Sequence, residues 1–162
     1  ALVIDSEHQL QCLLHKKYNM RRPKLADPAA LEINKYNPAL WAMVGREMTE
    51  DAVAELHGML SLEDMILVGH SISFDVRFLR TLFGEFGLKW KAPPQLDTRA
   101  LARLAWNLPC LKMDTIRKAQ GWGMKGAHSA FKDALDAYRI YRAYINAVQT
   151  LPPLQKIDDA KA

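Results

Sequence analysis

The chain has 162 residues, of which 49% are hydrophobic and 25% are charged, a composition typical of a single globular domain that buries its own core. No apolar run approaches the roughly 20 residues that cross a bilayer, and no secretory leader is visible, so we expect a cytoplasmic protein rather than a membrane-spanning or secreted one. The net charge of +4 and the pI near 9.1 mildly favour an anionic partner such as nucleic acid.

The first residues predict a short strand that ends beside two acids. Residues 1–4 (ALVI) are apolar, and Asp5 and Glu7 follow them directly. Residues i and i+2 of a strand point to the same face, so the two carboxylates project together. Such a pair repels unless a cation lies between its members. The alternative is a solvated strand end, and these residues alone do not decide between the two.

A second strand and a basic segment follow. Leu10, Cys12 and Leu14 recur at every second position, which predicts a strand. Residues 15–24 (HKKYNMRRPK) contain five fixed cations and one aromatic side chain. This segment indicates either a surface that contacts phosphate groups or a solvated hairpin.

Helix signals recur along the rest of the chain. Asp27 before Pro28 marks one helix start, and Thr49 marks another. Between them, residues 36–38 (YNP) predict a turn. The apolar periodicity predicts three further helices towards the C-terminus, over residues 99–106, 114–120 and about 129–148.

The central feature of the sequence is an apolar run at residues 66–69, followed by a polar turn and an amphipathic segment that contains Asp75. This pattern predicts a buried strand, a tight turn and the first turn of a helix. In an open α/β sheet the cleft lies beyond the carboxyl ends of such strands, so we expect Asp75 to face a cleft. Large apolar side chains recur in this helix at a spacing of four, and we interpret them as its core face: Phe74, Phe78, Leu82 and Phe86.

The C-terminal third predicts a short strand and a long helix. Asp97 ends the expected strand, and we interpret it as a cap or turn residue. A glycine-rich loop at residues 121–128 precedes the last helix, for which Ser129 is the expected N-cap. Asp136 on this helix is interpreted as a surface residue. Its apolar stripe is expected to consist of Phe131, Leu135, Tyr138 and Ile145.

Three short motifs now stand in a fixed order. They are an Asp-x-Glu pair at Asp5 and Glu7, the segment GHSISFD at residues 69–75, and His128 followed five residues later by Asp133. In this pattern the chain resembles the histidine-bearing subgroup of the DnaQ-like, or DEDD, superfamily of 3′–5′ exonucleases. Segments ALEIN (residues 30–34) and LDT (residues 96–98) are also similar to family segments, whereas Ser71 replaces the usual Asn and HQL follows Glu7 in place of a Thr-Thr-Gly-type turn.

The resemblance implies an α/β fold of the ribonuclease H-like type, a mixed central β-sheet flanked by helices. It also implies one exonuclease domain over residues 1–150, followed by a polar tail at residues 151–162. The implied activity is hydrolysis of phosphodiester bonds at the 3′ end of single-stranded nucleic acid, with DNA favoured and mononucleotides released. Carboxylate ligands suit Mg²⁺ or Mn²⁺, and two such ions about 4 Å apart are expected.

The family pattern also implies roles for five residues. Asp5 would bridge both ions, while Glu7 and Asp133 would help to hold the ion on the nucleophile side. Asp75 would serve the ion on the leaving-group side. His128 would be the general base, because an imidazole with a pKa near 6.5 suits proton transfer at neutral pH.

Four residues are expected to contact substrate, and they are Ile33, Asn34, His70 and Phe74. The expected partners are 3′ ends of single-stranded DNA, or of RNA, and a polymerase or repair protein. Two alternatives stay open at this point. One is an RNA-trimming enzyme of the oligoribonuclease type, and the other is a non-catalytic nucleic-acid-binding module on the same fold.

Overall fold

The computed structural model describes residues 2–4, 10–13, 18, 26–33, 36–125 and 129–150. Within these residues four strands form two pairs. The strands β1 (Leu2–Ile4) and β2 (Leu10–Leu13) are antiparallel, and β3 (Leu67–Gly69) and β4 (Gln95–Asp97) are parallel. The helices are α1 (Pro28–Ile33), α2 (Pro38–Val44), α3 (Glu50–Met59), α4 (Ile72–Glu85), α5 (Thr98–Trp106), α6 (Met113–Ala119) and α7 (Ala130–Gln149).

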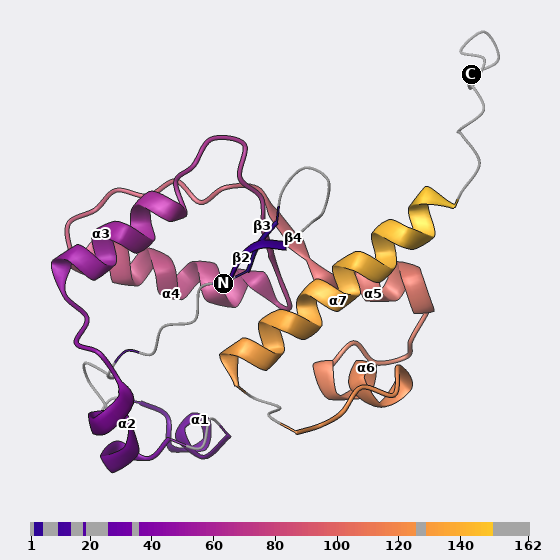
Figure 1. The fold of residues 1–162 in the computed structure, drawn as a ribbon, viewed down its shortest axis with the longest axis horizontal. Helices are drawn as coiled ribbons and strands as arrows, with labels where there is room; N and C mark the ends of the chain where they lie inside the picture. The colour runs from indigo at the N-terminus through magenta and orange to yellow at the C-terminus, as the bar shows by residue number, and fades with distance from the viewer. Residues whose placement is uncertain are drawn as a thin grey trace, which may run out of the picture.

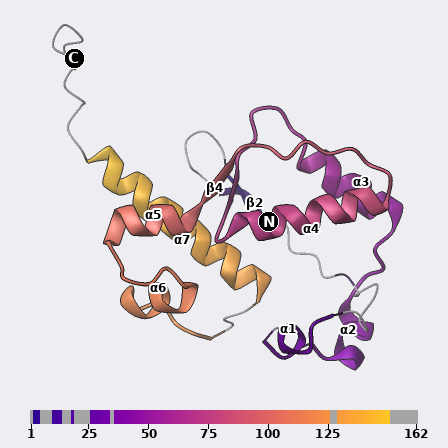
Figure 2. The ribbon, with the colours of Figure 1, turned by 180° about the vertical axis from the view of Figure 1, so that it is seen from behind.

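The helices divide into groups on either side of the β3–β4 pair. Figure 1 shows α5, α6 and α7 on one side of these strands and α3 and α4 on the other, and Figure 2 shows the same division from behind. The helices α1 and α2 lie together at one edge of the molecule. Both parallel and antiparallel strand pairs are therefore present among helices, as expected for a mixed α/β protein. No helix in the described part of the chain is long and apolar enough to cross a membrane.

The main core lies between α5, α6 and α7. It contains Leu101 and Ala102 from α5, Ile116 from α6, and Ile140 and Tyr141 from α7. Partly buried side chains of β3 and β4 pack against this cluster, which joins the strands to the helices. Burying a side chain of this size contributes about 1.5–3 kcal/mol, so these residues hold the C-terminal half together.

A second apolar cluster joins α3 to α4. Val53 of α3 and Val76 and Phe83 of α4 are buried. The ring of Phe83 meets His57 edge to face at 5.0 Å between centroids, and Trp90 in the same way at 5.1 Å. The indole N–H of Trp90 donates to the carbonyl of Leu60 at the end of α3, at 3.0 Å. The indole N–H of Trp90 is therefore hydrogen-bonded, while its ring packs against that of Phe83.

Helix starts follow the capping signals in the sequence. Asp27 accepts from the backbone N–H of Ala29, Thr49 caps α3, and Ser129 caps α7, so these three predictions are confirmed. The prediction of only a turn at residues 36–38 is wrong, because the short helix α2 begins there. Asn37 is its N-cap, with its side chain accepting from Leu40, and a proline occupies the first helical position.

The predicted core face of α4 is wrong in its first half. Phe74 and Phe78 are 53% and 63% exposed, whereas Val76 and Phe83 are buried. A helix turns by about 100° per residue, so a repeat of four advances by about 40° at each step and drifts around the helix. The aromatic stripe therefore begins far from the buried face. On α7 the prediction fails in a similar way at Phe131, which is 37% exposed.

Candidate functional site

The turn between β3 and α4 is held by the carboxylate of Asp97. Gly69 pairs with Asp97 at the carboxyl ends of the two parallel strands. One oxygen of Asp97 accepts from the backbone N–H of Ser71 at 3.1 Å and from that of Arg99 at 2.9 Å. Asp97 thus caps α5, which confirms its predicted role, and it also fixes the turn that leads into α4.

The backbone of this turn is tightly wound. Ser71 has a φ of 62°, in the left-handed region, and its side chain makes no capping hydrogen bond. A Cβ at Gly69 would lie 2.7 Å from Cδ1 of Ile72, so a larger residue would need this side chain to move. The left-handed region favours Gly and Asn, which gives a physical reason for the Asn that the family usually carries at the position of Ser71.

Asp75 lies in the first turn of α4, just beyond the carboxyl end of β3, and its side chain is exposed. Partial desolvation raises the pKa of its carboxyl above the ordinary value, and a hydrogen bond from its own backbone N–H opposes this only in part. A nearby cation would stabilise the ionised form. A perturbed carboxyl at the end of a strand makes Asp75 a candidate functional residue.

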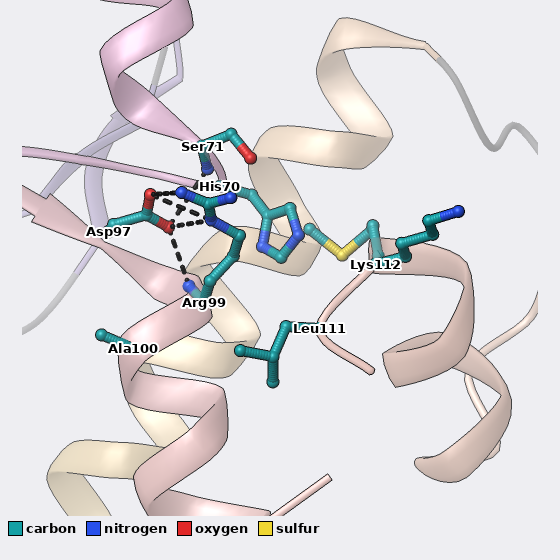
Figure 3. Close-up of a pocket in the computed structure, with 8 residues that line it drawn as sticks. His70, Ser71, Asp97, Arg99, Ala100, Leu111 and Lys112 are labelled. Carbon is teal, nitrogen blue, oxygen red and sulfur yellow. Dashed lines mark hydrogen bonds and ion pairs between the residues drawn. The ribbon is translucent and has the colours of Figure 1, made fainter. Parts of the chain in front are cut away.

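His70 lines a cavity of about 670 Å³ beside the ends of β3 and β4. Its Nδ1 lies 3.1 Å from the hydroxyl of Thr98 at the start of α5. Burial lowers the pKa of His70, although the negative charge of Asp97 opposes this, so the ring is neutral near pH 7. Figure 3 shows Arg99 turned towards Asp97 in this cavity, and the two side chains form an ion pair of 3.0 Å.

Asp133 lies in the first turn of α7 and is held by an arginine that the sequence analysis does not single out. Its Oδ1 accepts from Nη2 of Arg117 at 2.5 Å, and its side chain is 43% exposed. The same arginine donates to Asp136 at 2.7 Å. The prediction of a surface role for Asp136 is wrong, because its side chain is fully buried.

Several predicted site residues lie outside the described residues, namely Asp5, Glu7, Asn34 and His128. Ile33 ends α1, but its side chain is not described. Phe74 is exposed on α4 next to Asp75. The described residues contain no group of three or more acidic, His or Cys side chains that could hold a metal. They include two of the four predicted ligands, Asp75 and Asp133.

The elements that lead to these acids meet at one helix. Strand β1, which runs into Asp5, packs against α7, and so does β3, which leads to Asp75. Asp133 is in the first turn of α7 itself. The carboxyl ends of the strands in an open α/β sheet are where such proteins bind their ligands.

Residues 2–141 match the protein family described as Exonuclease, so the chain belongs to this family and is an exonuclease domain. This confirms the DnaQ-like resemblance and the ribonuclease H-like α/β class. The chain is 30% identical over 116 residues to the PolC-type DNA polymerase III of Thermotoga maritima, and 29% identical over 115 residues to that of Thermotoga petrophila. These matches cover 68% and 69% of this chain but 8% of each polymerase.

A third relative is a Mycobacterium tuberculosis protein provisionally named a bifunctional exonuclease/endonuclease. It is 29% identical over 110 residues, which are 66% of this chain and 17% of that protein. The chain therefore matches less than a fifth of the length of each of these three relatives. The similarity is confined to one part of much longer proteins.

Proposed function

We propose that this chain is a metal-dependent 3′–5′ exonuclease that removes mononucleotides from the 3′ end of single-stranded nucleic acid, with DNA as its preferred substrate. The observation that carries the proposal is the exonuclease family match over residues 2–141, which spans all five predicted catalytic positions. The similarity to proteins named DNA polymerases supports DNA over RNA. We extend the proposal to a polymerase as partner on the same ground, and to residues 1–150 as the extent of the domain.

The described carboxylates fit a hard divalent cation. Asp75 is exposed, and Oδ2 of Asp133 accepts no hydrogen bond from the part of the chain that the structure describes. Each acid therefore offers an oxygen for a ligand. All-oxygen ligation suits Mg²⁺ or Mn²⁺ better than Zn²⁺. Bound cations of this kind activate the attacking water and stabilise the leaving 3′ oxygen.

We assign the cation-binding and general-base roles to individual residues of the chain. Asp5, Glu7, Asp75 and Asp133 are proposed to hold the cations, and His128 to take the proton from the attacking water. His70 is a poor alternative base, since its Nδ1 contacts Thr98 and burial lowers its pKa. We assign His70 to substrate contact.

Three further residues are proposed to contact the terminal nucleotide. Phe74 is 53% exposed beside Asp75, with the guanidinium of Arg77 at 5.8 Å from its ring centroid. An exposed aromatic side chain next to a cation is suited to stacking with an unpaired base. Ile33 and Asn34 follow from the family pattern alone.

The test uses DNA and RNA oligonucleotides of the same sequence, each labelled at the 5′ end. The unmodified protein should shorten the DNA stepwise in Mg²⁺ or Mn²⁺ and should stop when EDTA is added. Asp75→Asn should lower the rate by at least about 100-fold, because even residues behind metal ligands often contribute 10- to 100-fold. His128→Ala should lower it by about 100- to 10,000-fold.

Asp51→Asn is the matched control, because Asp51 is also an exposed acid in the first turn of a helix, α3. This variant should keep full activity. Activity that survives EDTA would rule out the metal-dependent scheme, and an active Asp75→Asn protein would remove Asp75 from the site. Faster shortening of the RNA strand would instead favour an RNA-trimming enzyme.

A further inference from the structure

The most deeply buried cation in the described part of the molecule lies next to a proposed metal ligand. The side chain of Arg117, in α6, is 1% exposed. Each of its three nitrogens donates to a different carboxylate. Nε donates to Asp136 at 2.7 Å, Nη1 to Asp114 at 2.9 Å and Nη2 to Asp133 at 2.5 Å. The arginine is therefore fixed at three points.

Asp136 anchors this network in the interior. It is fully buried and also accepts from Lys132 at 2.6 Å and from Arg139 at 3.0 Å. Desolvation alone would raise the pKa of Asp136, but the hydrogen bonds from Lys132 and Arg117 outweigh it and lower the pKa. Burial likewise disfavours the charge of Arg117, yet its three carboxylate partners raise the pKa of the guanidinium. Both groups stay charged at neutral pH.

Among the described residues, the ion pairs of the network join three cations to three carboxylates. Two of the anions differ in exposure, because Asp136 is fully buried and Asp133 is 43% exposed. Asp114 is 41% exposed, so the network runs from buried Asp136 to two half-exposed carboxylates, those of Asp114 and Asp133.

We propose that Arg117 is a positioning residue for Asp133: it binds Oδ1 of that carboxylate and so directs Oδ2 towards a divalent cation. This inference rests on the proposed function, in which Asp133 is a metal ligand. A half-exposed Asp side chain in a first helical turn otherwise rotates among several rotamers, and binding a cation would then cost that freedom. The planar fork of Arg117, locked by Asp136 and Asp114, removes the freedom in advance.

A purely structural role would not need this third contact. The bond from Nε to Asp136 already joins α6 to α7, and the bond from Nη1 to Asp114 closes a turn within α6. The bond from Nη2 adds a second contact from α6 to α7, at the half-exposed carboxylate of Asp133. Residues that orient metal ligands in this way typically contribute 10- to 100-fold to metal affinity.

The test is Mn²⁺ binding, measured by electron paramagnetic resonance on the full chain without substrate. Arg117→Lys keeps the charge but cannot donate to three carboxylates from three fixed nitrogens, and it should weaken Mn²⁺ binding by about 10-fold or more. Arg139→Lys is the matched control, since Arg139 belongs to the same network and donates to Asp136 but makes no hydrogen bond to Asp133. This variant should lose stability while keeping the affinity for Mn²⁺.

The outcomes separate the two proposals. If the unmodified protein binds no Mn²⁺, the proposed function fails. If the unmodified protein and Arg117→Lys bind Mn²⁺ equally well, the function stands and the positioning role is overturned. Should Arg117→Lys not fold, a crystal of the unmodified protein soaked in Mn²⁺ decides. An ion on Oδ2 with the contact from Arg117 to Oδ1 intact supports the proposal, and an ion that displaces Arg117 overturns it.

Discussion

Replacement of Asp97 by Ala should destabilise the protein more than a typical change at a half-exposed position. The carboxylate caps α5 through Arg99 and satisfies the N–H of Ser71, which lies in a strained left-handed turn. Loss of a cap costs about 1 kcal/mol, and an unsatisfied, partly buried N–H costs about 1–3 kcal/mol. The two effects together should lower the free energy of unfolding by about 2–4 kcal/mol. For a chain of this length that lowers Tm by about 5–15 °C.

Thermal unfolding followed by circular dichroism measures this effect. Asp97→Asn keeps an oxygen acceptor in the same place, so it should lose about 1 kcal/mol or less. Glu63→Ala, in an exposed turn, serves as the control and should leave Tm unchanged. If Asp97→Ala unfolds at the same temperature as Glu63→Ala, the carboxylate does not hold the turn and this account is refuted.

The same carboxylate predicts a pH dependence. Desolvation raises the pKa of Asp97, but hydrogen bonds from the Arg99 side chain and from the backbone N–H groups of Arg99 and Ser71 outweigh it, so the pKa is lowered in the folded protein. The charge therefore adds stability above the unfolded-state pKa of about 3.9 and loses that contribution as the pH falls through the lower folded-state value. The difference in Tm between the unmodified protein and Asp97→Asn should accordingly shrink below about pH 4.

Two further changes test the turn itself. Ser71→Asn should raise the free energy of unfolding by about 0.5–1 kcal/mol, because Asn tolerates the left-handed conformation better than Ser. Urea titration measures this free energy, and a decrease would contradict the prediction. Gly69→Ala should cost about 1–3 kcal/mol through overpacking against Cδ1 of Ile72, and less in an Ile72→Val background, which lacks that atom. If the losses in free energy of unfolding from Gly69→Ala and Ile72→Val, measured in urea, simply add in the double variant, the contact of residue 69 with Cδ1 of Ile72 is excluded as the cause.

Signals that act within a few residues were enough to predict most helix starts. A cap is a contact between a side chain and a backbone N–H two or three positions later, so Thr49 and Ser129 can be identified without knowledge of the fold. Asn37 before a proline is the same signal, and the pattern that predicts a turn there is in fact the start of α2. A turn and a helix start are distinguished by the residues that follow them, and here the chain continues as a helix of seven residues.

The inward face of a helix is harder to predict, because it depends on what packs against it. Phe74 and Phe78 belong to a run of large apolar side chains, but α4 turns Val76 and Phe83 towards its neighbours instead. The run predicts that this helix carries many apolar side chains, but it does not predict which face of the helix is buried. An exposed aromatic pair beside Asp75, with ring centroids 4.7 Å apart, then becomes a feature of the proposed substrate surface rather than of the core.

The network around Arg117 shows why part of the site escapes a sequence pattern. Lys132, Asp133 and Arg139 each lie three or four positions from Asp136, and charges of both signs at this spacing on a helix ordinarily face solvent. Arg117 is 19 positions away from Asp136, and only the packing of α6 against α7 brings a buried cation to that face. The family pattern implies Asp133 as a ligand, since it lies five residues after His128 in the sequence, whereas the contact of Arg117 with it follows from tertiary structure alone.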